Sequence, residues 1–105
     1  MPDVFATARS GNVEKMQAIL SSDASAAQAS DGHNWTALMY SSMEGFTPVV
    51  QLLIASGAPV DARNVDGWTA LHFAAKNGKK AACELLLAAG ANVKSITMED
   101  GRWTF

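Results

Sequence analysis

The amino-acid sequence repeats itself at an interval of about 33 residues, a period that is typical of proteins built from stacked units. Eight residues that begin at Trp35, WTALMYSS, return as WTALHFAA from Trp68 onward, and Gly45 returns as Gly78. Each unit of such a stack needs its neighbours to bury an apolar face. A chain of this kind is expected to act through an extended surface and not through a deep catalytic pocket.

Each unit is predicted to contain two short helices followed by extended chain. In the last complete unit Thr69 precedes a first helix that ends near Gly78. A second helix extends from Lys80 to Leu87 and is closed by Gly90. Apolar residues in both helices recur at three- and four-residue spacing, which forms one apolar face. Glycine is the usual residue just past a helix end.

The preceding unit follows the same plan. Its first helix is predicted from Thr36 to Glu44 and is ended by Gly45. The pair Thr47-Pro48 then starts the second helix, with threonine suited to the cap and proline to the first helical position.

The two ends of the chain depart from the repeat. The first unit aligns with the others through Gly11 but is polar and irregular, as expected where a stack meets water. Near the other end, Trp103-Thr104 restart the pattern two residues later than the period requires, with the extra residues expected within 97–100. The predicted organisation is one domain, 1–105, with a degenerate N-terminal capping repeat (1–29), two repeats (30–62 and 63–95) and the start of a further repeat (96–105).

These residues resemble the ankyrin repeat, whose period is about 33 residues and whose first helix carries a Thr-Pro-Leu-His signature. The best match is DGWTALHFAA at 66–75 together with GANV at 90–93, and the resemblance covers nearly the whole chain. It implies an all-α ankyrin-repeat solenoid with about three repeats plus a truncated fourth. Helix pairs would stack in an L-shape, and β-turn fingers would project from one side.

The second unit departs most from the signature. Met39 replaces the histidine, so the hydrogen bonds that this histidine makes in the family are expected to be missing there. Ser41 and Ser42 replace an alanine pair. Asn34 stands where the third unit has Gly67, and asparagine tolerates positive φ better than most residues. We expect the second unit to be looser than the third.

The composition argues against several classes of function. Eight basic and ten acidic residues give no clustered basic face for nucleic acid, and no apolar run approaches the ~20 residues that a membrane-spanning helix needs. The single cysteine, Cys83, excludes an internal disulfide and favours an intracellular location, cytoplasmic or nuclear. The resemblance gives His72 a structural role, and His33 is expected on a finger loop. We expect no catalytic residue, no metal and no cofactor.

The tryptophans are the most prominent candidate binding residues, because all three occupy one repeat position. Tryptophan is enriched among residues that dominate interface energies. These rings can equally pack against neighbouring fingers, and both interpretations stay open here. With the positions that vary in the family, the predicted partner-binding residues are His33, Trp35, Met43, Glu44, Arg63, Asp66, Trp68, Lys76, Asn77 and Trp103.

The resulting hypothesis is a non-catalytic module that binds a partner protein through its concave face and fingers. It predicts that replacing Trp35 and Trp68 weakens binding without unfolding the domain. One alternative is a regulatory or targeting ankyrin domain of a larger enzyme or channel. Another is a self-associating fragment that forms a homodimer through an uncapped C-terminal face, since exposed apolar surface favours association.

Overall fold

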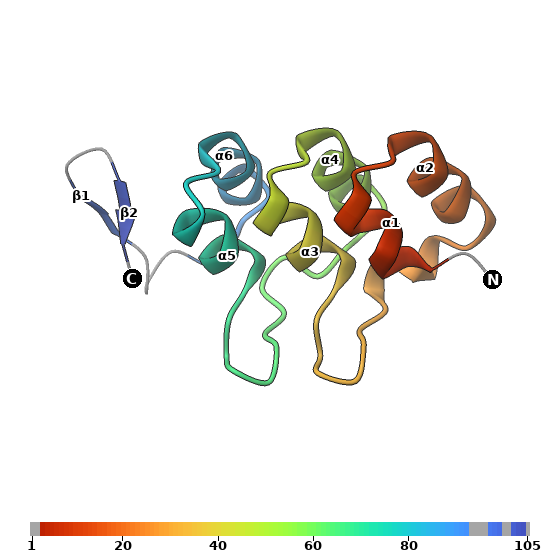
Figure 1. Ribbon diagram of the computed structural model, residues 1–105, viewed down its shortest axis with the longest axis horizontal. Helices are drawn as coiled ribbons and strands as arrows, with labels where there is room; N and C mark the ends of the chain where they lie inside the picture. Colours follow the sequence, from red (N-terminus) through yellow and green to blue (C-terminus); the bar gives the residue numbers. More distant parts are fainter. Residues whose placement is uncertain (1–2, 93–96, 100–101, 105) are drawn as a thin grey trace.

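The fold is a row of three helix pairs, seen in a computed structural model that describes residues 3–92, 97–99 and 102–104 (Figure 1). The pairs are α1 (Val4–Ser10) with α2 (Val13–Ser22), α3 (Ala37–Glu44) with α4 (Thr47–Ala55), and α5 (Ala70–Lys76) with α6 (Lys80–Ala88). A 3₁₀-helix, η1 (Ala24–Gln28), follows the first pair. The stacked helix pairs confirm the predicted all-α solenoid.

The helices form two rows. Helices α1, α3 and α5 contact one another in sequence to form an inner row, and α2, α4 and α6 form an outer row (Figure 1). Two loops, the fingers, project on the side of the inner row (Figure 1). The N–H of Asp31 donates to the carbonyl of Trp35 in the first finger, and the N–H of Asn64 donates to the carbonyl of Trp68 in the second, each at 2.9 Å.

Local sequence signals explain most helix ends. The side chains of Thr36 and Thr69 accept the N–H of the residue three positions later, as N-caps do. Asn34 has φ 62° and the equivalent Gly67 has φ 80°, so the predicted tolerance for positive φ is confirmed. The prediction that Thr47 caps the second helix is wrong. That helix, α4, begins at Thr47 itself, with Phe46 at the cap position and no side-chain cap.

Met39 takes over part of the task of the signature histidine. The N–H of Thr36 donates to Met39 Sδ at 3.4 Å, where the N–H of Thr69 donates to His72 Nδ1 at 3.1 Å. Thioether sulfur is a weak acceptor. The expected loss of hydrogen bonding at Met39 is therefore only partial.

One apolar core extends through all three pairs. Leu38, Leu53, Leu71 and Leu86 are fully buried, and so is Met16 in α2. Ser41, Ser42 and small alanines such as Ala74 are buried between them. Such small side chains allow neighbouring helices to approach closely.

The chain forms a short antiparallel hairpin after the third pair, from β1 (Thr97–Glu99) and β2 (Arg102–Thr104). Thr97 pairs with Thr104, whereas Ser30 bridges to Thr36 at the base of the first finger. The segment between Thr97 and Thr104 is one residue longer than the segment between Ser30 and Thr36. One of the two residues by which the last connector exceeds the repeat period therefore lies inside the hairpin. Residues 97–99 thus form a paired strand instead of an irregular insertion. Strand β2 contacts α5.

Candidate partner-binding surface

Among the described residues, five aromatic rings form a continuous row across the three helix pairs. Phe5 lies 6.0 Å from Tyr40, Tyr40 lies 4.9 Å from Trp35, Trp35 lies 4.4 Å from Phe73, and Phe73 lies 5.1 Å from Trp68, between ring centroids. Aromatic pairs attract one another at such distances. We call these five residues the aromatic row. It joins rings from α1, α3, α5 and both fingers.

Trp35 lies in the middle of the aromatic row and contacts two rings. Its plane is inclined by 28° to Tyr40 of its own unit and by 32° to Phe73 of the next unit. The ring is therefore partly buried in the joint between two repeats. This geometry favours packing as the main role of Trp35, one of the two interpretations of the tryptophans. The hypothesis that Trp35 and Trp68 can be replaced without unfolding the domain stays a prediction.

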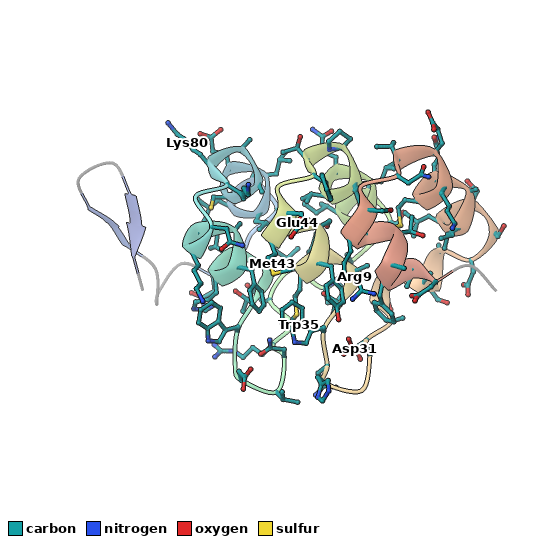
Figure 2. The ribbon with its side chains drawn as sticks, in the orientation of Figure 1. Arg9, Asp31, Trp35, Met43, Glu44 and Lys80 are labelled. Carbon is teal, nitrogen blue, oxygen red and sulfur yellow. The ribbon has the colours of Figure 1, made fainter. Side chains whose placement is uncertain are left out.

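Two cations lie over rings of the aromatic row. Arg9 Cζ is 5.1 Å from the centroid of the Tyr40 ring, and Figure 2 shows this side chain on the finger side of α1. Lys76 Nζ is 5.1 Å from the centroid of the Trp68 ring. Both side chains are exposed, and within the described part of the chain neither forms an ion pair. The ring faces attract both cations without neutralising their charge.

Asp31 ties the first finger to the aromatic row. Its carboxylate accepts the hydroxyl of Tyr40 at 2.5 Å and the N–H groups of His33 and Trp35, each at 2.9 Å. The bond from Tyr40 is the main reason that the pKa of Asp31 is lowered. Burial, followed by the bond to Asp31, raises the pKa of Tyr40 to about 12. The pair therefore remains a carboxylate and a neutral phenol at neutral pH.

Asn64 holds the equivalent position in the second finger. Its Oδ1 accepts the N–H groups of Asp66 and Trp68 at 2.9 and 3.0 Å. Its Nδ2 is buried and has no hydrogen-bond partner among the described residues. The ring that corresponds to Tyr40 in this unit is Phe73, which lacks a hydroxyl group. The missing partner is thus explained by a change from tyrosine to phenylalanine at the equivalent position of the next unit.

We predict that Phe73→Tyr stabilises the protein by about 1 kcal/mol, the net value of an ordinary hydrogen bond. The new hydroxyl would accept the Nδ2–H of Asn64, as Tyr40 bonds Asp31 in the first finger. Chemical denaturation followed by far-ultraviolet circular dichroism measures the change. The matched reverse substitution, Tyr40→Phe, should destabilise the protein. A Phe73→Tyr variant less stable than wild type would show that the site has no room for the hydroxyl group.

Most of the predicted partner-binding residues are exposed on this side of the molecule. The exposed ones are His33, Glu44, Arg63, Asp66, Lys76 and Asn77, while Trp35, Met43 and Trp68 are partly buried (Figure 2 labels Trp35, Met43 and Glu44). The side chain of Trp103 lies outside the described residues, and its backbone pairs with Met98 in the hairpin.

Hydrogen bonds between described residues connect adjacent units on this surface. Asn77 Nδ2 donates to the carbonyl of Met43 at 3.0 Å, joining the ends of α5 and α3. The N–H of Val65 donates to the carbonyl of His33 at 3.1 Å, joining the two fingers. The surface is therefore held by contacts between repeats as well as within them.

Several residues of this surface were not predicted from the sequence. Phe5, Tyr40 and Phe73 belong to the aromatic row, and Arg9 lies over its Tyr40 ring. A signal for Tyr40 and Phe73 was present, because each follows a repeat tryptophan by five residues. A signal for Arg9 was present as well, because Arg9 precedes Gly11 by two residues just as Lys76 precedes Gly78.

His72 acts in the cap of α5. Its Nδ1 accepts the N–H of Thr69 at 3.1 Å and lies 2.9 Å from Thr69 Oγ1, and an acceptor nitrogen must be unprotonated. Burial, followed by the charge of Arg63, lowers the pKa of His72 below its ordinary value of 6.5. The neutral imidazole is therefore the form that stabilises the fold.

We predict that the free energy of unfolding decreases as the pH falls below 6.5, the ordinary pKa of histidine. In this range the unfolded chain binds a proton that folded His72 resists, so protonation favours unfolding. Urea denaturation at a series of pH values measures the slope. A His72→Met variant, which copies Met39 of the second unit, should lose this component. Equal slopes for the two proteins would show that His72 is not the group responsible.

The described residues offer little for other chemistry. No group of three or more histidine, cysteine, aspartate or glutamate side chains in this part of the chain could hold a metal ion. Cys83 is fully buried, and burial, followed by the charge of Glu84, raises the pKa of its thiol to about 11. Such a thiol is unreactive at neutral pH. No described helix is both long and apolar enough to cross a membrane.

Stacked helix pairs, projecting fingers and a surface held between repeats define a solenoid of the helical-repeat class. The family model described as ankyrin repeats (3 copies) matches residues 4–97 of this chain. The chain therefore belongs to the ankyrin-repeat family. Ankyrin repeats are generally protein–protein interaction modules and are typically non-catalytic. A comparison with curated proteins found no matching relative.

Proposed function

We propose that this protein binds a partner protein, without catalysis, through the surface formed by α1, α3, α5 and the two fingers. We call this surface the finger face. The aromatic row is the observation that carries the proposal, because it orders side chains from all three repeats into one surface. Exposed polar and charged groups, including Glu44, Arg63 and Asn77, surround it.

The order of this surface bears directly on affinity. Hydrogen bonds between repeats hold Met43, Asn77 and the two fingers before any partner arrives. Side chains that are already ordered lose little entropy on binding, so modest contacts give useful affinity. We place this interaction in the cytoplasm or nucleus, in keeping with a lone cysteine that forms no disulfide.

Cysteine labelling can test the position of the binding site. Because Cys83 is buried, a cysteine introduced at an exposed position can be modified selectively with a bulky maleimide. Glu44→Cys places the label on the finger face, and Glu84→Cys is the matched control on α6 of the outer row. Both proteins would be checked for helical content and then used to capture proteins from an extract of the source cell.

A protein retained by wild type and by labelled Glu84→Cys, but lost on labelling Glu44→Cys, would support the proposed face. Retention by both labelled proteins would show that the partner binds outside the labelled part of the finger face. If the unlabelled proteins retain no specific protein, the proposed function itself is contradicted.

The homodimer through the C-terminal face stays a prediction. Strand β2 contacts α5, so part of the hairpin lies beside the third helix pair. A strictly monomeric mass at high protein concentration, measured by light scattering, would contradict the dimer.

A further inference from the structure

One repeat position presents its side chains in a line along the finger face. Arg9, Met43 and Lys76 each lie two residues before a glycine with positive φ, in three successive units. They come from α1, α3 and α5, which contact one another in sequence. The line therefore consists of a cation (Arg9), a thioether (Met43) and a second cation (Lys76).

The two cations are positioned and remain charged. Arg9 lies over Tyr40 and Lys76 lies over Trp68, both exposed and without an ion pair among the described residues. A ring face restricts the position of a cation but leaves other N–H groups able to donate to an oxygen acceptor. A carboxylate on a partner could bind each of them without displacing a carboxylate of the described residues.

The middle of the line, at Met43, favours an apolar group and disfavours a carboxylate. Met43 is partly buried and apolar, and the neighbouring Glu44 is exposed (Figure 2). The carboxylate of Glu44 would repel a carboxylate placed between the two cations, while Met43 offers a polarisable apolar contact. Asp31 does not alter this pattern, because its carboxylate is already bonded to Tyr40 and to two N–H groups.

Helix packing sets the distance between the cations. Packed helices lie about 8–10 Å apart, so two steps from α1 to α5 span about 16–20 Å. An extended chain advances about 3.3 Å for each residue, and this span corresponds to about five or six residues.

We infer that the partner contributes an extended segment with two carboxylates about five or six residues apart and an apolar residue between them. Arg9 binds one carboxylate, Lys76 binds the other, and the apolar residue lies against Met43. This inference rests on the proposed function and adds the chemistry of the segment recognised at the finger face.

A selection from random twelve-residue peptides displayed on phage tests the inference with the whole chain as bait. We expect the enriched peptides to carry two aspartate or glutamate residues at this spacing, with an apolar residue between them. Enriched peptides without such pairs would overturn the inference and leave the proposed function standing. If no peptide is enriched, the inference also fails, and the labelling and capture experiment separately decides the proposed function.

Affinities of the enriched peptides provide the second measurement. Arg9→Gln and Lys76→Gln should each weaken binding by about fivefold, the upper range for an exposed ion pair, and the loss should shrink as salt is raised. Lys80→Gln is the matched control, since Lys80 is exposed on α6 away from the fingers (Figure 2). An equal loss in Lys80→Gln would indicate general charge attraction and overturn the assignment to Arg9 and Lys76.

Discussion

Replacing Trp35 with alanine is expected to lower the free energy of unfolding by about 3 kcal/mol, the lower end of the range for large aromatic residues. The ring lies between Tyr40 of its own unit and Phe73 of the next, so its removal breaks the aromatic row at its centre. The lower end of the range applies because the ring is only partly buried. Urea denaturation followed by far-ultraviolet circular dichroism would measure the loss without relying on tryptophan fluorescence.

Val65→Ala is the control for this experiment. Val65 is 60% exposed, and substitutions of exposed residues usually change stability by less than about 0.5 kcal/mol. If Trp35→Ala were as stable as Val65→Ala, the stabilising role of Trp35 would be contradicted, and binding would be the role that is left for its ring. If the expected loss is found, reduced partner binding by Trp35→Ala cannot be attributed to a lost contact with the partner.

Gly11→Ala is expected to destabilise the protein by about 2–3 kcal/mol, because two separate costs add at this position. Gly11 has φ 71°, a left-handed conformation that costs other residues about 1–2 kcal/mol. A Cβ atom there would also lie 2.9 Å from three atoms of the Phe46 ring, which adds a steric penalty. Thermal or urea denaturation compares this variant with the equivalent substitutions in the other units.

The other two units supply the matched controls. Gly78 has φ 68° with no atom within 4 Å of a Cβ, so Gly78→Ala should cost only about 1 kcal/mol. At Gly45 the nearest atom is Cδ of Lys79, in a flexible side chain that can move away, so Gly45→Ala should behave like Gly78→Ala. Equal losses in all three variants would show that Phe46 yields to the added methyl group.

Local signals made much of the fold predictable. Threonine caps, helix-ending glycines and the positive φ of Asn34 depend on short-range hydrogen bonds and steric limits, which act within a few residues. The predicted position of the Thr47 cap was wrong by one residue. The chain turns tightly at Gly45, whose carbonyl accepts the N–H of Thr47. Helix ends are the least certain part of such predictions.

The candidate site was only partly predictable. The repeat showed that Trp35 and Trp68 occupy equivalent positions, but equivalence does not say which rings meet. Trp35 contacts Phe73, which is distant in the sequence, because stacking brings a finger of one unit against a helix of the next. The same stacking places Arg9 over Tyr40.

The sequence by itself determined the repeat, its helix pairs and the family, because a regular repeat period and local capping signals need no knowledge of distant contacts. Only the tertiary structure decided that the rings form one row, that Arg9 and Lys76 lie over two of them, and that Asn64 Nδ2 is left without a partner among the described residues. These features arise at the joints between units. There the packing geometry, and not the order of residues along the chain, sets which side chains touch.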